Sequence, residues 1–501
     1  MSEFQSSITQ LKAKLRDFFW PIHRKELTKF FSMALLMFSV LFNQNILRII
    51  KDSIVISEIS AEVTSFVKLY CVTPAAAIFF IFYAKMVNYL SYERIYNYFL
   101  MFFVGYFFLF AFVIYPNIEY FQIDPTVARS LMASYPNFKW YISMGAYWSY
   151  VIFYVLAELW PNIFYVLLFW QFANEITSTE QAGRFYTLFS LFGNSSLLVV
   201  GIIMMNLASK ESVLKLFCPG IKDDVLLVEA SIAMVVIFAI ISSLSIRFIT
   251  SRILTDPSLY KRAKAERSST PKLGLIESLK YVSRSHYLWL MLISSASFGL
   301  TMNLVEAVWK DRIKMLYPSV NEYAEFNGLF ILWTGVAIMF MTVAGNNLMR
   351  YKGWFAVAII TPVIIMVTGV MFFILVVFDK DLALIIDPTA TITPLMLAVS
   401  VGALQNILSK GAKFSIWDTS REMLYIPLDN ELKTKGKAAV DVISSKLGKS
   451  VSGLIQAILF TLIPAATYSS VAPFFMIVFT LTCILWINSV YKLYNEYKKI
   501  S

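Results

Sequence analysis

Charged residues are scarce in this sequence. Asp, Glu, Lys and Arg make up only 15% of its 501 residues, whereas 58% of the residues are hydrophobic and the mean hydropathy is +0.66. A soluble chain of this length would carry far more charge on its surface. The composition therefore excludes a soluble globular protein and predicts an integral membrane protein surrounded by a lipid bilayer.

Cysteine and histidine are rarer still. The three cysteines, Cys71, Cys218 and Cys483, lie far apart without a CxxC pair, which argues against a disulfide framework and against a zinc site. The two histidines, His23 and His286, have no acidic or metal-ligand cluster beside them. A membrane-embedded enzyme, such as a lipid-modifying transferase, therefore has little support, and we expect neither a metal nor a cofactor.

Two further signals are missing. The GKS triplet at 448–450 resembles the end of a phosphate-binding P-loop, but Ile443 occupies the position of the loop's first glycine and no predicted strand precedes it. The sequence thus contains no nucleotide hydrolase motif. Residues 1–27 are polar and basic, without a small-residue cleavage site before the first apolar run, so we expect no cleaved signal peptide.

Long apolar runs are abundant. Windows of roughly 20 residues predict about twelve transmembrane helices, so the expected fold is an all-α membrane protein. The fourth run is too long for one straight span and contains Pro161, so it is either one kinked helix or two segments. The approximate positions are 30–50, 64–86, 96–115, 143–171, 185–207, 227–248, 287–308, 325–346, 353–378, 391–412, 448–467 and 471–490.

The charges of the connecting segments orient these helices. A long polar segment in the middle of the chain and both chain ends are basic, whereas the connection at 379–390 is acidic. The positive-inside rule places the basic segments in the cytoplasm, and the layout is that of a two-halved transporter. We expect a cytoplasmic tail over 1–27, a six-helix bundle over 28–249, a basic cytoplasmic linker over 250–285, a second six-helix bundle over 286–491 and a cytoplasmic tail over 492–501.

Short motifs recur in the two halves. RIIKDSI near the end of the first predicted span corresponds to AVWKDRI at the end of the seventh, and FSLFGNSS entering the fifth corresponds to SSKLGKSV entering the eleventh. Short matches in an apolar chain also arise by chance. Their matching positions nevertheless favour two pseudo-symmetric halves related as a parallel repeat.

Charges inside the predicted spans are the main candidates for a functional site. An ionised group at the bilayer centre costs on the order of 2.5–3.5 kcal/mol, so a chain that keeps several is expected to direct them at a water-filled cavity. Lys68 either lines such a cavity or extends its long side chain to the lipid headgroups. Glu158 is too short to reach the headgroups, which favours a functional role.

Polar stripes accompany these charges at helical spacing. The stripe around Glu158 either offers rings on which a base stacks or packs against neighbouring helices. In the first span two cations suit an anion, although Asp52 is an alternative partner and Lys51 also fits a helix end. In the seventh span the alternative is an exposed salt bridge between Glu306 and Lys310. The stripes consist of Tyr147, Tyr150, Tyr154, Glu158, Asn162 and Tyr165; of Gln44, Arg48 and Lys51; and of Asn303, Glu306 and Lys310.

The run from Ser409 to Ser450 is the least membrane-like part of the second half. It is dense in lysine and is predicted to be a cytoplasmic connection, for which the positive-inside rule accounts. Lys446 and Lys449 differ, because they are predicted to enter the eleventh span beside Gly448, where a helix N-terminus favours phosphate.

Longer motifs identify a family. The sequence resembles the ATP/ADP translocases, the nucleotide transporters of obligate intracellular bacteria and plastids, from about residue 20 to its C-terminus. The block over 402–450 is the most specific part of the resemblance. The motifs are FVKLY, AELW, FWQFANEIT followed by AGRFY, NLVEAVWK, the YKGW…ITP…TG run from 351 to 369, GALQNILSKGAKFS, EMLYIPLDNELKTKGKAAVDV and LGKS.

The resemblance implies a major-facilitator-like bundle in the bacterial inner membrane, and the loop charges place both termini in the cytoplasm. It implies uptake of ATP in exchange for ADP and sometimes phosphate, by a monomer that binds no nucleic acid. The residues of this family linked to transport correspond to Lys68, Glu158, Glu306 and Lys449. We interpret the lysines as phosphate contacts or gates and the carboxylates as their partners in the empty state.

Several positions depart from the family pattern. Pro161 follows AELW where glycine is usual, and Glu175 stands where glutamine is common. The preferred nucleotide therefore stays open between ATP, guanine and pyrimidine nucleotides. The alternative function is a proton- or ion-coupled carrier of another small solute on the same fold, for which Glu158 and Glu306 would be the proton sites.

Overall fold

The computed structural model describes residues 22–212, 214–255, 285–385, 392–425, 427–428 and 437–500. Every regular element in these ranges is a helix, and no strand occurs in them. Eleven helical stretches in the described chain are long and apolar enough to cross a membrane. The expectation of an all-α membrane protein is therefore confirmed.

The helices of the first half form six of these spans, several of them with a π-helical turn. The bounds are α2 (Leu27–Glu58), α3 (Val63–Phe66), η2 (Val67–Val72), α4 (Thr73–Met86), α5 (Tyr92–Leu109), η3 (Phe110–Ile114), α6 (Ile118–Phe121), α7 (Pro125–Ser134), η4 (Pro136–Phe138), α8 (Lys139–Ala146), α9 (Trp148–Trp160), η5 (Pro161–Phe169), α10 (Trp170–Ile176), α11 (Thr179–Ala208), α12 (Leu214–Phe217), α13 (Asp223–Phe248) and η6 (Ile249–Ile253).

The second half contributes five spans and one helix whose apolar part is shorter. That helix is α20, of which only Ser450–Leu462 is apolar, and it occupies the place of the predicted eleventh span. The bounds are α15 (His286–Leu316), α16 (Val320–Val377), α17 (Asp379–Ile385), α18 (Pro394–Ala412), η7 (Lys413–Trp417), α19 (Asp418–Met423), α20 (Lys437–Leu462) and α21 (Tyr468–Ile500).

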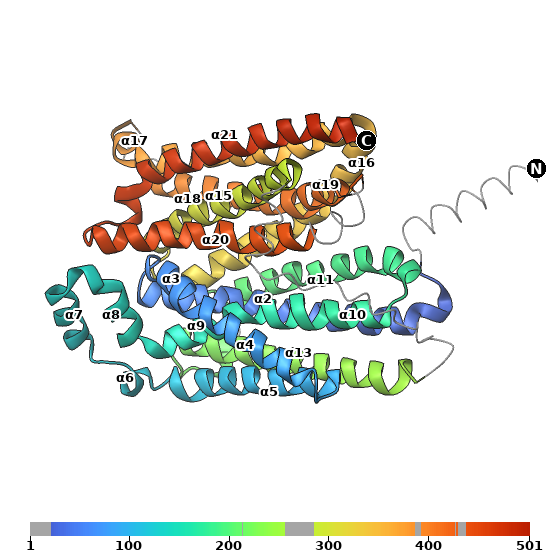
Figure 1. Ribbon diagram of the computed structural model, residues 1–501. Helices are drawn as coiled ribbons and strands as arrows, with labels where there is room; N and C mark the ends of the chain where they lie inside the picture. The colour runs from blue at the N-terminus through green and yellow to red at the C-terminus, as the bar shows by residue number, and fades with distance from the viewer. Residues whose placement is uncertain are drawn as a thin grey trace, which may run out of the picture.

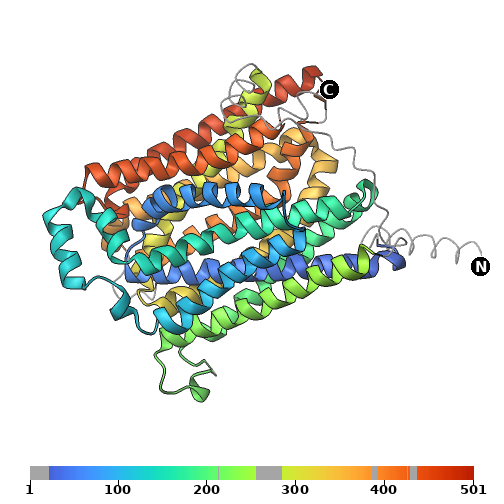
Figure 2. The same cartoon turned by 60° about the horizontal axis from the view of Figure 1, so that its bottom comes forward.

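The long helices run side by side in two groups (Figure 1, and turned in Figure 2). In the first group α2 packs against α9, α11 and α13, and in the second group α15 packs against α18, α20 and α21. The groups meet where α11 contacts α16 and where α3 and η2 contact α20. The start of α2 and the end of α21 lie at the same end of the bundle (Figure 1), as an even number of crossings requires.

Burial separates the central helices from the peripheral ones. In the first span 72% of the most apolar window is buried, against 22% in the second span. The peripheral helices expose large apolar side chains. Contact of these side chains with water would be unfavourable, whereas contact with lipid is not. Examples are Phe80, Met101, Phe340, Val367 and Leu481.

The fourth predicted span, which was expected to be either one kinked helix or two segments, changes its helix type at Pro161. The chain from Trp148 to Ile176 is one membrane-spanning stretch, with the π-helix η5 beginning at Pro161. Because proline has no N–H to donate, the α-helical hydrogen-bond ladder is interrupted there and a π-helical segment follows. The short helix α8 precedes this stretch and ends at Ala146.

The connection predicted over 409–450 is wrong in its extent. α18 continues through η7 and α19 to Met423, so Lys410 lies within a membrane-spanning stretch. α20 begins at Lys437, so Lys446 and Lys449 lie inside a helix and not at its N-terminus, and their helix-dipole interpretation fails. The side chains of Lys446 and Lys449 are outside the described residues, as are residues 1–21 of the predicted tail and 256–284 of the predicted linker.

Glycine allows the two halves to approach closely along α11 and α16. A Cβ atom at Gly201 would lie 2.6 Å from Leu332 Cβ and 2.8 Å from the carbonyl oxygen of Gly328. A Cβ atom at Gly328 would lie 2.9 Å from the Met205 backbone nitrogen. Small residues at such positions let membrane helices gain van der Waals contact that lipid cannot offer.

We therefore expect Gly201→Ala to lower the Tm of the purified protein by several degrees. The added methyl group must push α16 away from α11 and loosen the contact between the halves. Gly105→Ala is the matched control, because a Cβ atom at this helical position would meet no atom within 4 Å. Equal Tm values for the two variants, measured by thermal unfolding in detergent, would contradict the close packing described here.

Candidate functional site

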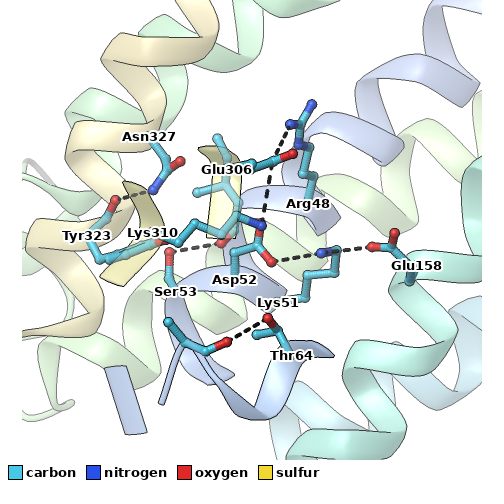
Figure 3. Close-up of polar contacts among 12 residues, drawn as sticks. Arg48, Lys51, Asp52, Ser53, Thr64, Glu158, Glu306, Lys310, Tyr323 and Asn327 are labelled. Carbon is cyan, nitrogen blue, oxygen red and sulfur yellow. Dashed lines mark hydrogen bonds and ion pairs between the residues drawn. The ribbon is translucent and has the colours of Figure 1, made fainter. Parts of the chain in front are cut away.

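Charged side chains from four helices meet in the bundle, and Figure 3 shows those of α2, α9 and α15. A charge buried among apolar groups is tolerated only beside counter-charges, so the chain gathers its intramembrane charges in one place. We call this group the central ion cluster. It consists of Arg48, Lys51 and Asp52 of α2, Glu158 of α9, Glu306 and Lys310 of α15, and Lys410 of α18.

Asp52 lies between two buried lysines (Figure 3). Its Oδ1 is 2.8 Å from Lys51 Nζ and its Oδ2 is 2.8 Å from Lys310 Nζ. The three side chains are 6%, 4% and 8% exposed, respectively. Lys51 also contacts Glu158 Oε2 at 2.9 Å and lies over the Tyr154 ring, 4.1 Å from its centroid. One aspartate therefore compensates an ammonium group from each half of the protein.

Glu306 is surrounded by three cations. Its Oε1 lies 3.2 Å from Arg48 Nη2, 3.6 Å from Lys310 Nζ and 4.0 Å from Lys410 Nζ. Lys410 Nζ is buried, has no hydrogen-bond partner among the described residues, and lies 4.7 Å from the centroid of the Phe330 ring. Glu306 and Arg48 remain 20% and 34% exposed in the middle of the bundle, so space beside them is accessible.

Two of these ion pairs connect the halves. Arg48 with Glu306, and Asp52 with Lys310, join α2 to α15. Exposed ion pairs contribute about 0–1 kcal/mol, whereas removing one partner of a buried pair costs about 3–5 kcal/mol. The buried pair between Asp52 and Lys310 is therefore the stronger constraint on the contact between α2 and α15.

Lys68 lies in the π-helical turn η2 and is half-buried. Its ammonium group has no hydrogen bond or ion pair with the described residues, but it lies within electrostatic range of Asp52, Glu158 and Glu306. A π-helical turn inserts one extra residue into the helix and changes which way the side chains around it point. This position favours the interpretation that the Lys68 side chain points toward the cluster. The alternative is that it extends to the lipid headgroups.

The cluster carries more positive than negative charge. Four cations face three carboxylates, and Lys68 adds a fifth cation close by. Excess charge of one sign in apolar surroundings is unfavourable unless an anion balances it. Lysine and arginine are the side chains that bind phosphate groups, so the arrangement suits a multiply charged phosphate anion.

Six of the predicted site residues lie in or beside the cluster. These residues are Arg48, Lys51, Lys68, Tyr154, Glu158 and Glu306. Two others donate hydrogen bonds to backbone carbonyls of their own helices and do not join it: Asn162 to Glu158 at 3.4 Å and Asn303 to Gly299 at 2.7 Å.

The predicted tyrosine stripe does not form one continuous surface. Tyr154 lies at the cluster, whereas Tyr150 is buried against Phe110 and Tyr115, so packing explains it. Tyr165 lies beyond Pro161 and contacts Trp170. Helical spacing could not predict the position of Tyr165, because η5 changes the phase of the helix after Pro161.

Asp52, Lys310 and Lys410 are central in the structure, although the sequence patterns offered only alternative or bland interpretations of them. The first two belong to the KD doublets of RIIKDSI and AVWKDRI, and this repetition in both halves was a usable signal. Lys410 was counted with the lysines of the following connection, because the true end of that helical stretch at Met423 has no capping residue pattern.

Further hydrogen bonds between described residues of the two halves lie toward the end of the bundle where α2 ends. They indicate a bundle that is closed at that end. They join Ser65 Oγ to Gln456 Oε1 at 2.5 Å, Asn137 Nδ2 to the Thr461 carbonyl at 2.9 Å, Lys314 Nζ to the Ile59 carbonyl at 3.1 Å and Asn321 Nδ2 to the Asp223 carbonyl at 3.2 Å.

Comparison with known proteins decides the family. The model of the TLC ATP/ADP transporter family matches residues 5–497. The chain belongs to this family. It is 61% identical over 496 residues to ADP,ATP carrier protein 5 of Rickettsia bellii and 59% identical over 496 residues to that of Rickettsia felis, and each match covers 99% of both chains. It is 39% identical over 494 residues to ADP,ATP carrier protein 4 of Rickettsia bellii, covering 98% of this chain and 94% of that one.

Solved structures confirm the major-facilitator-like fold of this TLC family member. A bacterial homologue of the iron transporter ferroportin in an inward-facing state has a TM-score of 0.58 at 14% identity, covering 94% of this chain and 98% of that one. The nucleoside transporter NupG has a TM-score of 0.56 at 9% identity, covering 93% and 100%. Family and fold together make the protein a membrane transporter and not an enzyme, as expected.

Asp52→Asn is expected to destabilise the transporter, because Lys51 and Lys310 then lose the carboxylate that they share. Breaking a buried ion pair on one side costs about 3–5 kcal/mol. We expect the variant to lose several degrees of Tm, or to be recovered in much lower yield, when thermal unfolding is followed by tryptophan fluorescence in detergent.

Two control variants separate this effect from a general loss of charge. Asp52→Asn combined with Lys310→Gln removes one charge of each sign and should recover part of the lost Tm. Lys215→Gln breaks an ion pair of 2.6 Å in which Asp223 is 57% exposed, and should change the Tm little. A Tm of Asp52→Asn equal to that of Lys215→Gln would rule out the proposed constraint.

Proposed function

We propose that this transporter exchanges a nucleoside triphosphate, ATP in the first instance, for ADP or a related nucleotide by alternating access. The observation that carries the proposal is the excess of cations in the central ion cluster, which suits the phosphate groups shared by all nucleotides. The Rickettsia relatives are named as ADP,ATP carriers, and their similarity over nearly the whole chain supports the same substrate class.

In the proposed mechanism the carboxylates hold the cations while the transporter is empty. Arriving phosphate groups compete for Arg48 and Lys68 and weaken the contact between Arg48 and Glu306 that joins the halves. Because a ligand shifts a conformational equilibrium only through different affinities for the two states, this competition supplies the required difference. The halves 28–249 and 286–491, joined by the linker 250–285, then rock around the site.

The proposal also assigns an orientation. We place the protein in the bacterial inner membrane as a monomer, with both termini in the cytoplasm. The start of α2 and the end of α21 at one end of the bundle support this topology (Figure 1). With that orientation, the hydrogen bonds near the end of α2 close the outer side, and the substrate approaches from the cytoplasm in this state.

The first test is counter-exchange in proteoliposomes loaded with ADP. We expect uptake of radiolabelled ATP, release of the label on chase with unlabelled nucleotide, and loss of at least about nine-tenths of the uptake in Lys68→Gln and Glu158→Gln. Lys215→Gln, in an exposed ion pair, should transport normally. GTP, CTP and UTP tested in parallel identify the preferred base.

Uptake of another solute driven by a pH gradient, without uptake of any nucleotide, would favour the ion-coupled carrier instead. In that case Glu158 and Glu306, which are partly exposed, would be the proton sites. The two functions are therefore separated by the driving force as well as by the substrate.

Exchange of two nucleotides that differ by one charge is expected to respond to membrane potential. Moving one elementary charge across the membrane changes the free energy by about 2.3 kcal/mol per 100 mV. Imposing a potassium diffusion potential on the proteoliposomes should therefore change the initial rate of ATP uptake in exchange for ADP, and leave homologous exchange of ADP for ADP unchanged. If the potential leaves the ATP-for-ADP exchange as unchanged as the ADP-for-ADP exchange, a compensating ion moves with the nucleotide.

A further inference from the structure

We propose that Lys410 binds the terminal phosphate of the transported triphosphate, and that Glu306 occupies this phosphate subsite while the transporter is empty. The proposal rests on the nucleotide exchange proposed above and assigns a part of the substrate to a part of the cluster. The cations of the cluster differ in their ion pairs, hydrogen bonds and exposure, and these differences support the assignment.

Lys410 is a buried cation whose ammonium group has no hydrogen-bond partner in the described part of the chain. Its side chain is 12% exposed, its nearest carboxylate oxygen is 4.0 Å away, and the face of the Phe330 ring is its other contact. An ammonium group has three donors, and leaving them unused in a buried place is unfavourable. The Lys410 ammonium group can therefore donate to the oxygen of a bound anion.

The carboxylate of Glu306 stands where a phosphate group would fit. Three cations approach one of its oxygens at distances of 3.2 to 4.0 Å, which is more positive charge than one carboxylate balances. A terminal phosphate carries more negative charge and three acceptor oxygens. It can therefore contact Arg48 and Lys410 at the same time, at hydrogen-bond distances that Glu306 does not reach with both.

Arg48 differs from Lys51 and Lys310 by its accessibility, and Lys410, which is 12% exposed, differs from them by its longer distance to a carboxylate. Arg48 and Glu306 are 34% and 20% exposed, whereas Lys51 and Lys310 are at most 8% exposed and are held by Asp52 at 2.8 Å. A phosphate group that replaces Glu306 thus meets Arg48 and Lys410. Lys310 Nζ also lies 3.6 Å from Glu306 Oε1, but Asp52 already holds this lysine at 2.8 Å. Displacing Glu306 also breaks its ion pair with Arg48, which joins the two halves.

The test compares Lys410→Gln with Lys413→Gln in proteoliposomes. Lys413 lies three residues further along, is paired with Asp418 at 3.0 Å and serves as the matched control. We expect Lys410→Gln to raise the KM for ATP by at least about tenfold, which is the loss of one charge-assisted hydrogen bond, and the KM for ADP by much less. Lys413→Gln should leave the ratio of the two KM values unchanged.

A binding measurement without a nucleoside tests the subsite independently of transport. Inorganic tripolyphosphate should raise the Tm of the wild-type protein, and the increase should be lost in Lys410→Gln. Glu306→Gln should lower the tripolyphosphate concentration needed for half of the Tm increase by at least about threefold, because the competing carboxylate is gone, even though its transport rate falls.

The outcomes separate this proposal from the proposed function. If the wild type exchanges ATP for ADP but Lys410→Gln raises both KM values equally, or behaves as Lys413→Gln does, the terminal phosphate does not bind at Lys410. Weaker tripolyphosphate binding by Glu306→Gln would overturn the role given to Glu306. Stabilisation by tripolyphosphate that depends on Lys410, in a protein that exchanges no nucleotide, would support the subsite and contradict the proposed function alone.

Discussion

The structure depends on the compensation of charge inside an apolar bundle, and Asp52 is where this constraint is strongest. Two ammonium groups from different halves share its carboxylate at 2.8 Å each, with almost no exposure to solvent. A buried ion pair is weak evidence for net stability, yet breaking it on one side is costly. The contact between α2 and α15 is therefore specified by electrostatics as well as by packing, and any movement of the halves must keep these charges paired.

This constraint explains why the cluster divides into two layers. Lys51 and Lys310 have Asp52 as a carboxylate partner at 2.8 Å, whereas Arg48 and Lys410 contact Glu306 at 3.2 and 4.0 Å. Lys310 contacts both carboxylates, since it also lies 3.6 Å from Glu306. A transporter needs contacts of both kinds, because its substrate must exchange partners with some groups without dismantling the fold. The partial exposure of Glu306 places the exchangeable layer next to accessible space, and the burial of Asp52 keeps the permanent layer away from it.

Sequence reasoning predicted the fold class and the charges that stand out along the chain. Glu158 was recognisable because it interrupts an apolar run and its side chain is too short to reach the lipid headgroups. Lys410 was not, because a lysine two residues before a predicted helix end at 412 is explained by the positive-inside rule, and only the continuation to Met423 places it within the span. The pairing of Asp52 with Lys310 lies beyond local patterns, since it depends on how two distant helices pack.

The KD doublets add a last argument about symmetry. Lys51 with Asp52, and Lys310 with Asp311, occupy matching positions in α2 and α15, so exact symmetry would give each aspartate the same partners. Instead Asp52 binds both lysines, and Asp311 has no ion pair or hydrogen bond within the part of the chain that the structure describes. Two similar halves thus form an asymmetric contact, in which one carboxylate serves two cations.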